Sequence, residues 1–164
     1  MPLVARVDAP GVVCLTWRLS TRPAAVWRHL TDVDRLPEWL GRRQDGSFTA
    51  GDHLVVDHGD GYLCRSDVLV AQDGRSLAMS WQFPDEPPSR VTIELETVLP
   101  DDAMPDGATD LHLEHHELAD LAGSYLPGWI THLTYFEASL HGEPLPTGSF
   151  WRLYETHDRL TTRS

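Results

Sequence analysis

The sequence has few of the features that mark a secreted, membrane-bound or redox-active protein. It contains only two cysteines, Cys14 and Cys64, and they lack the C-x-x-C spacing of a redox or zinc motif. We expect both to be buried free thiols. No apolar run reaches the ~20 residues of a membrane-spanning helix, and residues 1–13 include Arg6 and Asp8, unlike a signal peptide. These absences predict a soluble, cytoplasmic protein with no membrane partner.

Positive charge is scarce as well. The chain has 13 Lys and Arg against 25 Asp and Glu, which gives a net charge of −12. Such a surface repels phosphate backbones, so we expect no nucleic-acid partner. The sequence also has no Gly-x-Ser-x-Gly elbow, no reactive cysteine signature and no glycine-rich phosphate loop. We therefore assign no catalytic residue and no cofactor, and we favour a non-enzymatic protein.

The 164 residues that are present fit a single domain, residues 1–164. No internal repeat, low-complexity stretch or linker divides the chain. We place the core of the domain at about residues 12–142 and a C-terminal extension at 143–164. The extension is apolar enough to dock on the body or on a partner, through Phe150, Trp151, Leu153 and Tyr154.

The N-terminal region predicts one strand and two short helices. Val12–Leu19 alternates apolar and polar residues, which is typical of a half-buried strand. Thr21 and Pro23 then precede a helical spacing of apolar residues that ends at Leu30, so we expect a helix with Thr21 as its N-cap. A second, brief helix is indicated around Leu36–Leu40.

Residues 47–117 favour a series of antiparallel strands. Gly-Asp and proline-rich breaks separate segments in which apolar and polar residues alternate, as in Leu77–Phe83 and Val91–Glu96. The last break is a long acidic loop at residues 100–110. We expect a sheet of about six or seven strands, with one apolar face that another element must cover.

A long amphipathic helix from about Ser124 to Leu140 is the element that can cover this face. We expect Ser124 to cap its first turn, Gly142 to end it and His132 to lie off its apolar face. That apolar face consists of Trp129, Leu133, Phe136 and Leu140. The predicted fold class is α+β.

Several motifs together carry a family resemblance. They are Pro23–Asp32 followed by Trp39-Leu40, then Leu77–Trp81, then Thr109–His115, and finally Gly128-Trp129 with His132-Leu133 and Gly142. In this order they resemble the helix-grip superfamily called START-like or SRPBCC, in the branch of activators of heat-shock protein ATPase (C-terminal-type domain). The resemblance implies a birch-pollen-allergen-like fold: a curved antiparallel sheet wrapped around a long C-terminal helix, with two short helices after the first strand.

The resemblance also implies a cavity for apolar ligands between the sheet and the last helix. Ten inward-facing residues are candidates to line it: Trp17, Met79, Trp81, Ile93, Leu95, Leu113, His115, Trp129, Leu133 and Phe136. The alternative for the apolar members is ordinary core packing, which large side chains at strand and helix spacing favour.

His115 is the most informative histidine in the sequence. Strand alternation puts it on the inner face with Leu113 and Glu117, where an ionisable pair beside apolar residues would orient a ligand. The alternative is a strand end that lies in solvent or bonds to nearby backbone.

His112, Glu114 and His116 alternate on the opposite face of the same strand. This spacing binds zinc when a neighbouring segment supplies a further ligand, for which His53 and His58 are candidates. A solvated strand face accounts for the three residues better, so we predict no metal.

Three functions follow from the resemblance. The favoured one is non-enzymatic binding or sensing of a small hydrophobic molecule, with a stress-related role as a further option. The alternatives are a co-chaperone-like module whose partner is a chaperone, and a cyclase- or hydratase-type enzyme that uses His115 or Glu117 on an apolar substrate. The apolar extension and an exposed sheet edge also make a homodimer plausible.

Overall fold

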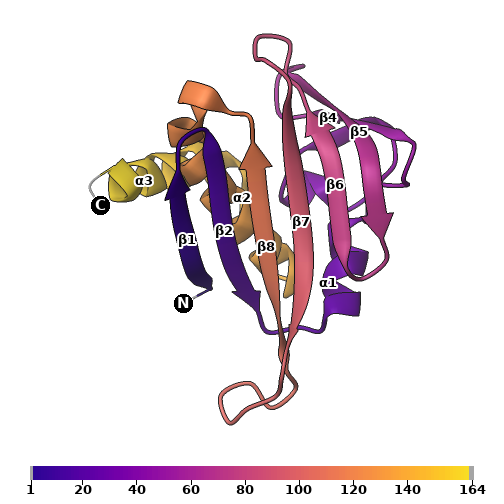
Figure 1. Cartoon of the computed structure of the whole chain (residues 1–164), viewed down its shortest axis with the longest axis vertical. Coiled ribbons are helices and arrows are strands. Elements are labelled where there is room, and N and C mark those ends of the chain that lie inside the picture. The colour runs from indigo at the N-terminus through magenta and orange to yellow at the C-terminus, as the bar shows by residue number, and fades with distance from the viewer. Residues whose placement is uncertain (1, 163–164) are drawn as a thin grey trace.

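The computed structural model describes residues 2–162, and its main feature is one curved sheet of eight antiparallel strands. Along the sheet the strands are ordered β1-β2-β8-β7-β6-β5-β4-β3 (Figure 1). Their bounds are Leu3–Ala9 (β1), Val12–Leu19 (β2), Arg42–Gly46 (β3), His53–Asp57 (β4), Leu63–Gln72 (β5), Ser76–Trp81 (β6), Ser89–Val98 (β7) and Ala108–His116 (β8).

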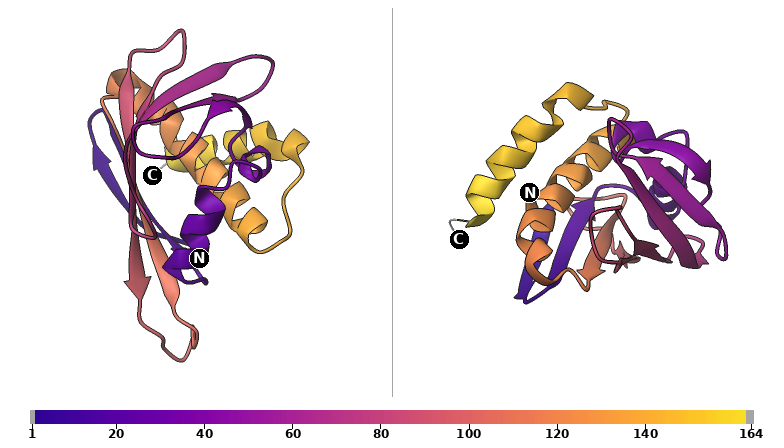
Figure 2. Two further views of the ribbon diagram at one scale, coloured as in Figure 1. Left: turned by 90° about the vertical axis from the view of Figure 1, so that its right-hand side faces the viewer. Right: turned by 90° about the horizontal axis from the view of Figure 1, so that it is seen from above.

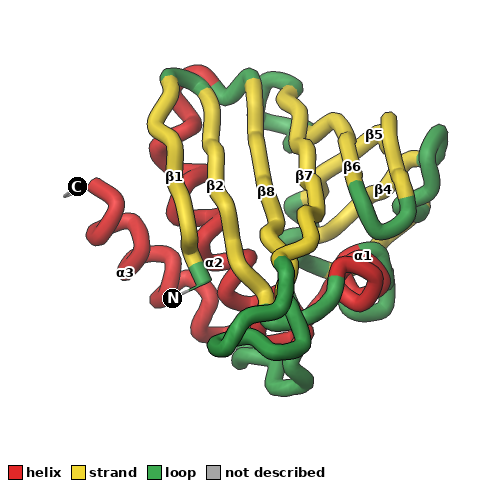
Figure 3. The backbone as a smooth tube through the Cα atoms, turned by 60° about the horizontal axis from the view of Figure 1, so that its bottom comes forward, coloured by secondary structure: helices red, strands yellow, loops and turns green. Residues whose placement is uncertain are grey.

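Within residues 2–162 three α-helices accompany the sheet, and the longest one lies along its inner face (Figure 2). The α-helices are α1 (Pro23–Leu30), α2 (Ala122–Leu140) and α3 (Phe150–Thr162), and the short 3-10 turns are η1 (Leu36–Glu38), η2 (Ala119–Leu121) and η3 (Thr147–Ser149). The helix α3 lies beside α2, and the loop between β7 and β8 projects beyond the end of the sheet (Figure 3). This arrangement confirms the predicted α+β helix-grip fold.

The strand β2 has the predicted bounds because its alternation matches its surroundings. Every second residue, from Val13 to Leu19, is buried against the helices, and the residues between them face outward. The strand pairs over this whole length with β8, with Val13 opposite His115 and Leu19 opposite Thr109. The two strands thus form part of the rigid floor beneath α2.

Two of the eight strands were not predicted from the sequence. The strand β1 lies at one edge of the sheet and β3, which reads Arg-Arg-Gln-Asp-Gly, lies at the other. An edge strand pairs on one side only, and these two bury few side chains, so neither shows a strong apolar alternation. The sheet is therefore wider than the six or seven strands expected.

The caps predicted for two helices were wrong. The helix α2 begins at Ala122 because η2 leads directly into it, and Leu121 occupies the N-cap position without a side-chain cap. Ser124 is inside the first turn and donates a hydrogen bond from its hydroxyl to the Leu121 carbonyl oxygen (2.9 Å). At α1 the N-cap position is Arg22 rather than Thr21.

The end of α2 is as predicted. Gly142 has a φ of +79°, and its N–H bonds to the carbonyl of Ser139, which closes the last turn. Glycine adopts this left-handed conformation without the steric strain that a side chain would cause.

Glu117 does not share the inner face with His115, which corrects the prediction. The chain leaves the sheet after His116, Glu117 takes a φ of +68°, and its side chain is exposed. No ionisable pair therefore stands on the inner face at this point of the described chain.

The remaining predictions concern the cysteines, the membrane and the tail. Cys14 and Cys64 are both free; Cys64 is buried and burial raises its thiol pKa to about 12, whereas Cys14 is only partly buried. In residues 2–162 no helix is long and apolar enough to cross a membrane. The tail docks on the body, since α3 packs on α2 and the Tyr154 hydroxyl donates to the carbonyl of Ser124 (3.2 Å).

Candidate functional site

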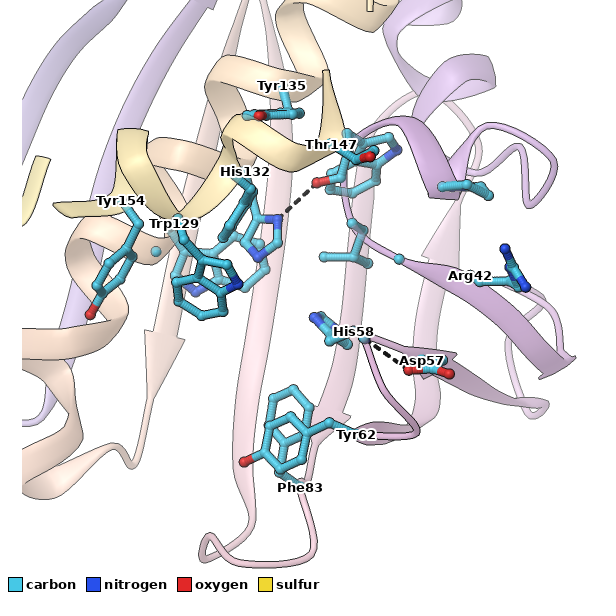
Figure 4. A pocket seen from close by; sticks show the side chains of 18 of the residues that line it. Arg42, Asp57, His58, Tyr62, Phe83, Trp129, His132, Tyr135, Thr147 and Tyr154 are labelled. Carbon is cyan, nitrogen blue, oxygen red and sulfur yellow. Dashed lines mark hydrogen bonds between the residues drawn. The ribbon is translucent and has the colours of Figure 1, made fainter. Parts of the chain in front are cut away.

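A cavity of about 680 Å³ lies beside α2, at one end of the space between this helix and the sheet (Figure 4). Five parts of the chain line it: η1 with the start of β3, the β4–β5 turn, the end of β6 with the loop after it, α2, and the η3–α3 segment. This volume is in the range of sites that enclose a drug-sized molecule.

Aromatic rings are frequent in the cavity wall. Trp129 on α2 packs against Trp81 at the end of β6, with ring centroids 5.3 Å apart. Tyr62 stacks on Phe83 at 4.2 Å, and their planes are within 5° of parallel. The aromatic members of the lining are Trp39, Tyr62, Trp81, Phe83, Tyr125, Trp129, Tyr135, Phe150, Trp151 and Tyr154. Flat apolar ligands stack well on such surfaces.

His132 projects from α2 into this aromatic wall. Its Nδ1 lies 2.8 Å from the backbone carbonyl oxygen of Trp39, which only accepts, so Nδ1 carries the proton. Burial lowers the pKa of His132 to about 4, and the ring is neutral at physiological pH. Its second nitrogen, Nε2, is then an acceptor, and it has no hydrogen-bond partner among residues 2–162.

His58 comes from the β4–β5 turn and faces His132, with ring centroids 5.9 Å apart. Its ring also lies edge-on to Trp81 and to Phe83. Burial, together with the nearby His132, lowers the pKa of His58 to about 3, so it is neutral too. Its Nε2 atom is buried and has no hydrogen-bond partner within the described chain.

A chain of hydrogen bonds runs along one side of the cavity. The indole N–H of Trp81 donates to the hydroxyl of Tyr125 (3.1 Å), which donates to the carboxylate of Glu86 (2.5 Å). Burial and the bond to Glu86 raise the pKa of Tyr125 above its ordinary value. This chain holds two aromatic rings in fixed orientations.

The charge of the lining is mostly negative. Four carboxylates belong to it, from Glu38, Asp57, Asp60 and Glu86, whereas among residues 2–162 the one Lys or Arg in the lining is Arg42. In Figure 4 the Arg42 side chain extends away from the other labelled side chains. The cavity therefore offers little to an anionic ligand.

His115 lies deeper and is fully bonded. The indole N–H of Trp129 donates to its Nδ1 (3.0 Å), so its proton is on Nε2, which donates to the Ser89 hydroxyl (2.7 Å). Ser89 in turn donates to the carbonyl of Trp81 (3.2 Å). Burial lowers the pKa of His115 to about 3. This histidine is buried at the inner strand face, not at a strand end in solvent.

Of the ten residues proposed from the sequence to line a cavity, Trp81 and Trp129 do so. The others lie outside the lining: Leu95 is partly buried against the core, His115 is bonded within it, and the remaining six are core residues, namely Trp17, Met79, Ile93, Leu113, Leu133 and Phe136. A ligand-binding role for these eight stays a prediction.

The sequence analysis missed several lining residues, and His132 is the most important. It was assigned away from the apolar face of the helix, yet its ring lies 5.7 Å from that of Trp129. The separation of three residues between Trp129 and His132 was a signal that the two share a helix face. His58 was considered only as a zinc ligand, and nothing local in the sequence indicates its position.

The candidate zinc ligands do not converge on one point. His112 bonds to Glu96 (2.8 Å) and His116 to Glu114 (2.8 Å) on the outer face of the sheet, while His53 bonds to Asp45 (2.8 Å). Within residues 2–162 no three His, Cys, Asp or Glu side chains are grouped closely enough to hold a metal ion.

A curved antiparallel sheet around a long C-terminal helix, with a cavity beside that helix, defines a helix-grip protein of the START-like, or SRPBCC, superfamily. A family model described as "Activator of Hsp90 ATPase homolog 1-like protein" matches residues 20–139. The chain belongs to this family, as its motifs predicted. No curated protein matches the chain.

Solved structures share the fold at low sequence identity. CalU16 from Micromonospora echinospora has a TM-score of 0.71 at 21% identity, over 94% of this chain and 91% of CalU16. DynU16, from the dynemicin biosynthetic locus, has a TM-score of 0.70 at 22% identity, over 83% of this chain and 49% of DynU16. The Aha1 dimer from Colwellia psychrerythraea has a TM-score of 0.60 at 18% identity, over 79% of this chain and 95% of that one.

Proposed function

We propose that this protein binds a small, largely apolar aromatic molecule in the cavity beside α2. The observation that carries the proposal is a cavity of about 680 Å³ that ten aromatic side chains help to line. Binding sites for small molecules are concave and mostly apolar, with a few polar groups that orient the ligand. His58, His132 and the Tyr125–Glu86 pair are such polar groups here.

Equilibrium dialysis with 2-methoxynaphthalene, a neutral two-ring probe, tests the proposal. Gly128 lines the cavity, and a Cβ atom added there would approach Tyr154 at 3.8 Å, so Gly128→Leu should fill space without a backbone clash. We expect this variant to lose at least about tenfold in affinity, because the added side chain competes with the probe.

The matched control is Gly123→Leu, on the same helix. Gly123 is exposed, is not part of the cavity lining, and has nothing within 4 Å of an added Cβ. Its affinity for the probe should equal that of the unchanged protein. Absence of binding to the unchanged protein, or equal binding by both variants, would refute the proposal. Native mass spectrometry after purification without detergent would identify a ligand that the protein already carries.

A cyclase- or hydratase-type enzyme is the second candidate, because the cavity wall contains two imidazole side chains. A general base works best with a pKa near the working pH, whereas the pKa values of His58 and His132 are about 3 and 4. Both are weak bases, which is why we prefer binding over catalysis. Turnover of a bound substrate that is lost in His132→Phe would favour the enzyme instead.

A co-chaperone role, suggested by the family description, makes a different prediction. Binding to a chaperone would survive Gly128→Leu, because that change alters only the cavity. A cytoplasmic location and a homodimer remain further proposals, and light scattering of the purified chain tests the second.

A further inference from the structure

The polar groups inside the cavity restrict the chemistry of its occupant beyond aromatic character. Two histidines from segments distant in sequence lie edge-on to each other in its wall, and both are neutral at physiological pH. They differ from His115, whose two nitrogens are both hydrogen-bonded. The inference that follows rests on the proposed binding function.

His132 presents an acceptor. Its Nδ1 lies 2.8 Å from the carbonyl oxygen of Trp39, which fixes the proton on Nδ1. The lone pair of Nε2 has no donor in the described chain. His132 is only partly buried and lines the cavity, so this acceptor is open to an O–H or N–H group of a ligand.

His58 does not offer such an acceptor. Its Nε2 is buried against the rings of Trp81 and Phe83 and has no hydrogen-bond partner within the described chain. A ligand in the cavity therefore meets the ring of His58 as part of the wall, and Nε2 of His132 is the acceptor that it can reach.

We propose that the cavity selects aromatic ligands that bear a neutral hydroxyl group, of the phenol class, and that His132 recognises this hydroxyl. The hydroxyl donates to Nε2 of His132. The four lining carboxylates act against a carboxylate-bearing ligand, since Arg42 is directed away from the site.

Three probes with the same ring system test this selectivity: 2-naphthol, 2-methoxynaphthalene and 2-naphthoate. Equilibrium dialysis at pH 7 should show 2-naphthol binding about tenfold more tightly than 2-methoxynaphthalene, which cannot donate, and 2-naphthoate binding least. In His132→Phe the affinity for 2-naphthol should fall to that for 2-methoxynaphthalene, while the affinity for 2-methoxynaphthalene stays the same.

Two further variants separate recognition from structure. His132→Gln keeps a hydrogen-bonding side chain and should retain most of the preference for 2-naphthol. His116→Phe, on the outer sheet face, is the matched control and should change neither affinity. The His132→Phe affinity for 2-methoxynaphthalene reports whether the cavity is still formed; if that variant does not fold, the His132→Gln measurement decides.

The outcomes distinguish this inference from the proposed function. If 2-methoxynaphthalene binds but 2-naphthol binds no more tightly, the hydroxyl inference is wrong and the binding function stands. Equal weakening of both ligands by His132→Phe also overturns it, because His132 would then only shape the wall. If none of the three probes binds, the proposed function itself fails.

Discussion

The histidines on the two sides of Trp129 differ in how they are bonded. Behind the cavity wall, His115 is fully buried and both its ring nitrogens have partners, Trp129 and Ser89. In the cavity wall, His132 has one bonded nitrogen, and the buried Nε2 of His58 has no partner in the described chain. The surrounding side chains are aromatic in both places.

This difference separates a structural histidine from a recognition histidine. Buried polar groups in folded proteins are almost always hydrogen-bonded, so a fully bonded histidine such as His115 needs no ligand to explain it. An unpaired nitrogen in the wall of a cavity is the exception that indicates a binding role. The comparison predicts that a change of His115 reduces stability, whereas a change of His132 reduces binding.

The largest expected effect is the dependence of stability on pH. The pKa values of His58, His115 and His132 are about 3, 3 and 4 in the folded protein and ~6.5 when unfolded. Below pH 6.5 the unfolded chain binds protons that the folded chain does not, so the free energy of unfolding falls as pH decreases. Each histidine contributes a slope of up to about 1.4 kcal/mol per pH unit. Urea unfolding at pH 7, 6 and 5 measures it, and a pH-independent stability would contradict the buried, neutral state of all three.

His115→Ala should be the most destabilising single substitution of those considered. It leaves the N–H of Trp129 without its acceptor and the Ser89 hydroxyl without a donor, and it opens a cavity in the core. We expect a loss of about 3 kcal/mol or more in the free energy of unfolding. His116→Ala, on the outer face, is the control and should change stability by less than about 0.5 kcal/mol. If the two changes lower the free energy of unfolding equally, His115 is not more important for stability than a residue on the outer face of β8.

Gly41→Ala, in the cavity wall, should have an intermediate effect on the free energy of unfolding. A Cβ atom at residue 41 would lie 2.5 Å from the carbonyl oxygen of Asp57 and 2.7 Å from Val56 Cγ1, so η1 and β4 would have to separate. Such overpacking typically costs about 2 kcal/mol. Thermal unfolding beside Gly148→Ala, where an added Cβ meets nothing within 4 Å, measures the difference. If Gly41→Ala leaves the melting temperature unchanged, the backbone at this wall of the cavity can move apart at little cost.

The smallest effect on stability is expected for Trp151→Ala, in the part of α3 that lines the cavity. Trp151 is 67% exposed yet lines the cavity, so its loss should change stability by less than about 0.5 kcal/mol and weaken 2-methoxynaphthalene binding about threefold. Leu160→Ala is the matched control, since Leu160 is 65% exposed on the same helix but is not part of the lining. If both variants bind the probe equally, α3 takes no part in the site.

Much of the fold could be predicted from the sequence, because the signals that determine it are local. The alternation of Val12–Leu19 identified β2 with its bounds, and Gly142 identified the end of α2. The edge strands β1 and β3 were not predicted because an edge strand buries few side chains and needs no strict alternation. The N-cap of α2 was predicted wrongly because η2 leads into that helix without a polar cap.

The candidate site was predictable only in part. Trp81 and Trp129 were identified by their inward spacing, but spacing does not report whether an inward side chain meets another one or faces a cavity. For Met79, Leu113 and most of the other candidates, the interior is filled.

The sequence by itself determined the α+β class and most of the elements, since periodicity and turn residues are properties of neighbouring residues, and its motifs carried the resemblance to the family. Only the tertiary structure decided that a cavity stays open beside α2, that α3 closes one side of it, and that His58 meets His132 there. These contacts join segments far apart in the chain, and their geometry depends on how whole elements pack together.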